Sequence, residues 1–153
     1  MDFALSDDQR AIQEAARDFL ADAANPDVVR AAVESETGFD ETLWASLAGE
    51  LGFAGILVPE AFGGLGMGAV EMALVLEETG RTLAPVPFFE TAVLAVLAVR
   101  EAGSKAQQAA PLPRLAPGAR ARLLMPVGAH ARPADASGRP RPPSRFSFSE
   151  GLS

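Results

Sequence analysis

The chain has 153 residues, a formal net charge of −7 at pH 7 and a mean hydropathy of +0.14. Its hydrophobic content of 48% and charged content of 22% are typical of one soluble globular domain with its own core. The chain has no cysteine, which excludes a disulfide framework and a thiolate metal site.

The charge distribution and the lack of sorting signals indicate which partners and which cellular location to expect. Residues 1–110 carry 18 Asp/Glu and 6 Lys/Arg, a net −12, whereas residues 111–153 carry 2 and 7, a net +5. An acidic body argues against nucleic acid as the main partner. The start lacks the basic and apolar regions of a signal peptide, and the longest apolar run, residues 92–99, is far shorter than the roughly 20 residues of a membrane span. We expect a cytoplasmic protein with no membrane span.

Capping residues and apolar periodicity predict three helices in the first third of the chain. Ser6 and Gln9 have the spacing of a capping box, and an apolar face follows them. Asn25 precedes a proline and caps a short second helix over residues 27–34. Asp40 caps a third helix with a stripe of leucines and a tryptophan.

The stretch 51–80 is the most specific part of the sequence. Residues 53–59 are apolar and end in a proline, which we interpret as an extended buried connector. Four glycines within six positions then predict a loop (Gly63, Gly64, Gly66, Gly68). Residues 69–79 are apolar nearly all round in the middle, which predicts a buried central helix capped by Gly80.

The next third predicts one long and one short helix. Pro85 and Pro87 keep residues 83–88 non-helical, and an apolar helix follows over residues 89–102. Ser104 caps a last short helix. The predicted fold class is therefore all-α, with about five to six helices.

Residues 111–153 differ in composition, with eight of the twelve prolines and seven arginines. This composition predicts a disordered Pro/Arg-rich tail, which we assign to residues 119–153. Its charge alone would allow contact with nucleic acid or an anionic membrane, but only Phe146 and Phe148 are available for stacking, so we favour an unstructured end. His130 is the single histidine, so no metal site is expected.

Two further patterns allow a functional and a structural interpretation. Gly64-x-Gly66-x-x-Ala69 fits a dinucleotide-binding pattern, but no βαβ unit surrounds it, so we favour close loop packing. Glu77 and Glu78 are neighbours about 100° apart on a helix and cannot share a proton. At a helix C-terminus they need a salt bridge, for which Arg81 is a candidate, or an interface.

Four motifs in order resemble the amino-terminal helical domain of the acyl-CoA dehydrogenases and assign it to residues 1–118. Residues 83–88 further resemble actinobacterial members linked to steroid side-chain degradation. The motifs are Phe3-x-Leu5-Ser6-x-x-Gln9, Leu51-Gly52-Phe53-x-Gly55 continuing to Pro59-Glu60-x-x-Gly63-Gly64-x-Gly66, Glu77-Glu78-x-Gly80, and Leu112-Pro113-Arg114-Leu115-Ala116-x-Gly118.

The resemblance implies an FAD-dependent oxidation of an acyl-CoA thioester to the 2,3-enoyl-CoA, with the flavin carrying the redox chemistry. In the family the glutamate base and most of the flavin site belong to a β domain and a carboxy-terminal helical domain. We assign no catalytic or cofactor-binding residue to this chain. It is expected to be inactive alone and to work with those domains or a partner subunit as a homo- or hetero-oligomer. The alternative is a non-catalytic helical partner subunit or interaction module.

The resemblance also points to a substrate-binding segment. In the family, the corner after the glycine-rich loop and its helix closes the far end of the acyl pocket. Here that corner holds Phe88, Phe89, Glu90 and Val93. The alternative for Glu90 is a solvated first-turn residue favoured by the helix dipole.

The chain departs from the family pattern after Gly118. Family members continue with a strand-forming segment, whereas this chain continues with arginine, alanine and proline. We hypothesise a shifted reading frame or a wrongly placed gene end near Gly118. Translation of the other two frames tests this, because a β-rich continuation must appear in one of them.

Overall fold

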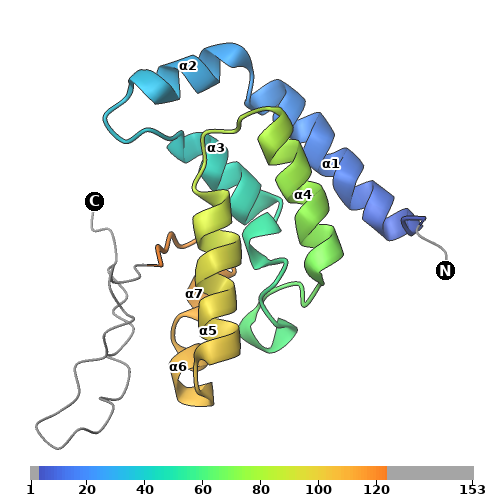
Figure 1. Ribbon diagram of the computed structural model, residues 1–153, viewed down its shortest axis with the longest axis vertical. Coiled ribbons are helices and arrows are strands. Elements are labelled where there is room, and N and C mark those ends of the chain that lie inside the picture. The colour runs from blue at the N-terminus through green and yellow to red at the C-terminus, as the bar shows by residue number, and fades with distance from the viewer. Residues whose placement is uncertain (1–3, 124–153) are drawn as a thin grey trace, which may run out of the picture.

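The computed structural model describes residues 4–123, and every regular element among them is helical (Figure 1), which confirms the all-α prediction. The predicted tail beyond residue 123, including His130, lies outside the described residues. The elements are α1 (Asp7–Ala23), α2 (Pro26–Glu34), α3 (Glu41–Ala45), the π-helical η1 (Ser46–Glu50), the 3-10 turns η2 (Phe53–Gly55) and η3 (Glu60–Phe62), α4 (Ala69–Arg81), the π-helical η4 (Phe89–Ala95), α5 (Val96–Ala102), α6 (Lys105–Ala109) and α7 (Leu112–Leu115).

The predicted helix starts are confirmed by their capping bonds. Ser6 Oγ accepts from the Gln9 amide at 3.1 Å, and the Gln9 side chain accepts from the Ser6 amide at 3.1 Å. Asn25 caps α2 and Asp40 caps α3, each through side-chain oxygens. Ser104 caps α6 with a second capping box. Each cap satisfies amides that the first helical turn leaves without a partner.

The connector between η1 and the glycine-rich loop is buried as predicted, but it is not extended. The Gly55 amide donates to Gly52 O at 3.0 Å and the Ile56 amide to Phe53 O at 3.3 Å, which makes successive tight turns. The prediction of an extended segment was therefore wrong. Tight turns satisfy the backbone internally while Ile56 and Val58 remain fully buried in the core.

Helix α4 runs past Gly80, which was predicted to cap it. Gly80 lies in the last turn, and the helix ends at Arg81 with Thr82 as its C-cap. The helix thus extends two residues beyond its predicted end at residue 79, and the ion pair from Arg81 to the Glu78 carboxylate three residues earlier, at 3.0 Å, favours helical geometry there.

The chain also forms a helix in the last of the four family motifs, at residues 112–118. Leu112 and Leu115 of α7 are fully buried and join the core beside α5. After α7, residues 118–123 return across the body. The proposed boundary at Gly118 stays a prediction.

Helices α1 and α4 lie side by side (Figure 1) and share a buried carboxylate. The Glu78 side chain is 1% exposed. Its Oε1 accepts from Arg17 Nη2 at 2.8 Å, and its Oε2 accepts from Arg81 Nε at 3.0 Å. The hydrogen bond from Arg17 lowers the pKa of Glu78 below its ordinary value, against the opposing effect of burial. The neighbouring Glu77 is about half exposed and pairs with Arg81 at 2.9 Å, so the predicted salt bridge is present.

No helix within residues 4–123 is long and apolar enough to cross a membrane. The same residues contain no group of three or more His, Asp or Glu side chains placed to hold a metal ion.

We predict that Glu78→Gln destabilises the chain by about 1–3 kcal/mol, because two arginines lose their shared ionic acceptor. Urea unfolding followed by Trp44 fluorescence measures this. The exposed Glu77→Gln is the control, with an expected change within about 0.5 kcal/mol.

Because the pKa of Glu78 is lowered on folding, its contribution to the free energy of unfolding is complete above pH 4.5 and is lost as the pH falls below that value. The acid loss should be shallower in Glu78→Gln. Equal stability and equal acid profiles of wild type and Glu78→Gln would refute this role.

Candidate functional site

The four residues of the predicted acyl pocket lie at the start of one helix, but on different sides of it. Phe88 is 2% exposed, and its ring meets Trp44 edge-on at 6.4 Å between centroids. Phe89 is 50% exposed, Glu90 is exposed and Val93 is half-buried. Phe88 therefore belongs to the core, Phe89 and Glu90 face outward from η4, and Val93 packs partly against the core.

An apolar surface runs along η4 and α5. Phe89, Val93 and Leu97 recur every four residues, which places them along one side of the helix, and Leu94 lies beside them. Leu94 is 36% exposed, and Val93 and Leu97 are half-buried. We call these four residues the η4 face. It is chemically suited to apolar matter such as an acyl chain or another protein surface.

The glycine-rich loop uses its own amides for folding. The amides of Leu65 and Met67 donate to Gly55 O and Ile56 O, both at 2.9 Å, and the Gly66 amide donates to Val58 O at 2.9 Å. At the start of α4 the Gly68 amide donates to Glu71 Oε2 at 2.9 Å. A phosphate would have to displace these bonds and meet the Glu71 carboxylate. The geometry favours close packing over nucleotide binding.

Gly64 explains why this loop needs glycine. A Cβ atom built on Gly64 would collide with the carbonyl oxygen and the Cβ of Val58. Val58 is fully buried, so neither partner has room to retreat. The loop therefore lies directly on the buried connector and fixes where α4 begins.

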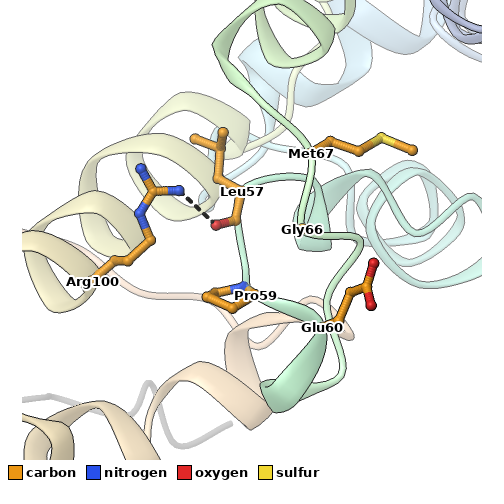
Figure 2. A pocket seen from close by; sticks show the side chains of 6 residues that line it. All are labelled: Leu57, Pro59, Glu60, Gly66, Met67 and Arg100. Carbon is orange, nitrogen blue, oxygen red and sulfur yellow. Dashed lines mark hydrogen bonds between the residues drawn. The ribbon is translucent and has the colours of Figure 1, made fainter.

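A hollow of about 330 Å³ opens beside this loop (Figure 2). Its wall combines apolar side chains with Glu60 and Arg100 (the full lining is Leu57, Pro59, Glu60, Gly66, Met67 and Arg100). Arg100 Nη1 donates to Leu57 O at 3.0 Å, shown dashed in Figure 2, and its Nε donates to Glu101 at 2.7 Å. The guanidinium thus ties α5 to the connector.

The hollow does not fit a flavin dinucleotide. Its volume lies at the lower end of the range of small-molecule sites. The adjoining loop amides are engaged within the fold, and Glu60 places negative charge where a pyrophosphate would need donors.

A profile of the acyl-CoA dehydrogenase N-terminal domain matches residues 6–119. The chain belongs to the acyl-CoA dehydrogenase family. The matched range covers the helical body, from the cap of α1 to the residue after Gly118. The resemblance drawn from the four sequence motifs is confirmed.

Individual acyl-CoA dehydrogenases support the assignment. The chain is 38% identical over 116 residues to acyl-CoA dehydrogenase IpdE2 of Mycolicibacterium smegmatis, a match covering 76% of the chain and 36% of that relative. It is 41% identical over 81 residues to benzylmalonyl-CoA dehydrogenase of Aromatoleum aromaticum, covering 53% and 21%.

Two solved structures share the fold. One is a variant of the Tcur3481-Tcur3483 steroid acyl-CoA dehydrogenase, with a TM-score of 0.67 at 41% identity, covering 74% of this chain and 30% of that one. The other is the ChsE4-ChsE5 complex of Mycobacterium tuberculosis, with a TM-score of 0.70 at 30% identity, covering 77% and 32%. These structures and the mycobacterial relative support the resemblance to the actinobacterial steroid-linked subgroup. The chain spans about a third of the length of these proteins.

The sequence did not reveal two side chains of this acyl-CoA dehydrogenase domain that hold the chain where it leaves the helical body, at residues 118–121. Trp44 Nε1 donates to Gly118 O at 3.0 Å, and Thr91 Oγ1 donates to Ala121 O at 3.1 Å. Thr91 could have been singled out, because a polar residue at the start of a long apolar helix predicts that its hydroxyl has a hydrogen-bond partner. Its partner is a backbone group 30 residues away, and no pattern in the sequence identifies that group.

We predict that Gly64→Ala destabilises the domain by about 2–3 kcal/mol, since the new Cβ overpacks the contact with Val58. Chemical denaturation is the measurement. Gly80→Ala is the matched control, because a Cβ there meets nothing within 4 Å and Gly80 lies inside α4. That variant should be more stable than wild type by about 0.5–1 kcal/mol. Equal effects of the two substitutions would contradict the packing role of the loop.

Proposed function

We propose that this chain serves as the amino-terminal domain of an FAD-dependent acyl-CoA dehydrogenase that forms a 2,3-enoyl-CoA from an acyl-CoA thioester. The observation that carries the proposal is the family match over residues 6–119. The chain covers about a third of its relatives, so the catalytic base and most of the flavin site would come from polypeptide outside the described domain. Alone, this chain would be inactive.

The η4 face and its neighbours would contribute to the acyl site. Phe89 and Val93 offer apolar area to an acyl chain. Fully burying a phenylalanine contributes about 1.5–3 kcal/mol, and the 50% exposed Phe89 would supply about half of that. Glu90 follows Phe89 in the first turn of η4 and would mark the polar limit of the site. Phe88, packed against Trp44, would hold this corner rigid from below.

A partner is part of the proposal. One related structure is a complex of two named chains, ChsE4 and ChsE5, which supports a homo- or hetero-oligomeric assembly for this chain as well. The β and carboxy-terminal helical domains of the family, or a partner subunit that carries them, would hold the FAD against the acyl-CoA. We propose a cytoplasmic location for this assembly.

Purification of the full chain, tagged in its native host, tests the proposal. We expect a yellow assembly whose flavin absorbance bleaches when an acyl-CoA is added without an electron acceptor. A pure, folded and colourless chain that binds no acyl-CoA would instead support the rival function, a non-catalytic helical interaction module.

Within that assembly, we predict that Glu90→Ala changes the preference among acyl chain lengths. Removing the carboxylate lengthens the apolar part of the proposed site, so kcat/KM should rise for longer chains relative to shorter ones. A series of saturated acyl-CoAs measures this preference. Glu34→Ala, an exposed glutamate at the end of α2, is the control and should leave the preference unchanged. An unchanged preference in Glu90→Ala would remove Glu90 from the proposed site.

A further inference from the structure

Residues 118–123 form a strap that is fastened to the helical body at three points. Trp44 Nε1 donates to Gly118 O at 3.0 Å. The Arg120 guanidinium lies 4.7 Å from the centre of the Phe39 ring. Thr91 Oγ1 donates to Ala121 O at 3.1 Å and accepts from the Ala121 amide at 3.3 Å.

The first fastening explains the glycine at residue 118. Gly118 has a φ of +103°, which side chains with a Cβ rarely adopt, and a Cβ built there would lie 2.7 Å from Ala48 Cβ. The strap backbone therefore lies directly on Ala48 beside the bond from Trp44.

The third fastening is the most specific, because one hydroxyl serves both backbone groups of one residue. Thr91 is fully buried, and a buried hydroxyl without a partner would cost free energy. Its partners are the amide and the carbonyl of Ala121, and both bonds would be lost if the strap moved away from the helix. The register along the helix is set by Gly118, whose contact with Ala48 leaves no room for a Cβ atom.

Thr91 also lies inside η4, next to Glu90 and two residues before Val93. π-helical turns within helices occur frequently at functional sites. The same helical turn thus presents the proposed acyl-binding residues on its outer side and grips the strap with its buried hydroxyl.

We propose that Thr91 is a positioning residue: it fixes the strap, through which the chain leaves the helical body, relative to the η4 face. The proposal rests on the proposed function, because the position of residues 118–123 matters for an acyl chain that binds between this face and the polypeptide or partner subunit that completes the acyl site. Loss of the hydroxyl would release the strap. The η4 face could then shift relative to the polypeptide that forms the other side of the acyl site.

Thr91→Val tests the strap directly in the full chain of 153 residues, since valine keeps the shape and removes the hydroxyl. We expect hydrogen exchange at the Ala121 amide to accelerate about tenfold or more relative to the Val75 amide in buried α4, which reports global unfolding. The Trp44 emission should shift to longer wavelength as its bond to Gly118 loosens.

Two further variants separate positioning from general stability. Thr91→Ser keeps a hydroxyl and should restore the protection of Ala121. Thr79→Val removes a comparable bond, Thr79 Oγ1 to Leu76 O at 2.8 Å inside α4, and should leave the ratio between Ala121 and Val75 unchanged. If Thr91→Val accelerates exchange equally at both amides, the residue only stabilises the core and the proposal is overturned.

The flavin-bearing assembly tests the link to the acyl site. We expect Thr91→Val to raise KM for long acyl-CoAs several-fold with little change in kcat, and Thr91→Ser to restore KM. A released strap with an unchanged KM would overturn the positioning role. A wild-type assembly without acyl-CoA-dependent bleaching would refute the proposed function, while hydrogen exchange would still decide whether Thr91 holds the strap.

Discussion

The contact between Gly64 and Val58 is the constraint on which the rest of the fold depends. Because no side chain fits between the two backbones, the glycine-rich loop is pressed onto the buried connector. The loop fixes the start of α4, and α4 in turn holds α1 through the buried Glu78 carboxylate. The turn after α4 then delivers η4 with Phe88 seated against Trp44. The glycines thus act through packing, and the functional surface lies on the helix that they help to position.

The structure separates two kinds of residue in the predicted acyl corner. Phe88 is buried in the core. Within the described residues, Phe89 and Glu90 are exposed and Val93 is partly exposed. An exposed phenylalanine beside half-buried valine and leucine side chains is a surface that gains free energy when covered. This physical argument agrees with the family relationship, since relatives of about three times the matched length carry further polypeptide that can provide such cover.

Much of the helical organisation was readable from the sequence because its signals are local. The capping residues Ser6, Asn25, Asp40 and Ser104 each act within three residues, and the structure confirms all four. The end of α4 was misread because Gly80 is a strong local stop signal, whereas the ion pair between Arg81 and Glu78 favours helical geometry one residue beyond it.

The remaining features depend on contacts between residues far apart in the sequence. The connector at residues 53–58 looked extended because an apolar run of that length is typical of strands, and only the surrounding core decides its turns. The strap could not be foreseen, since Thr91 and Trp44 bind backbone groups that every residue possesses. The candidate acyl residues came from family resemblance, which does not distinguish the buried Phe88 from the exposed Phe89.

The most direct test of the account is a crystal structure of the chain in its assembly with a bound acyl-CoA. We predict acyl carbons within about 4.5 Å of Phe89 and Val93, with the strap held at Thr91 beside them. An η4 face covered by another protein surface, with the acyl chain bound elsewhere, would contradict the account.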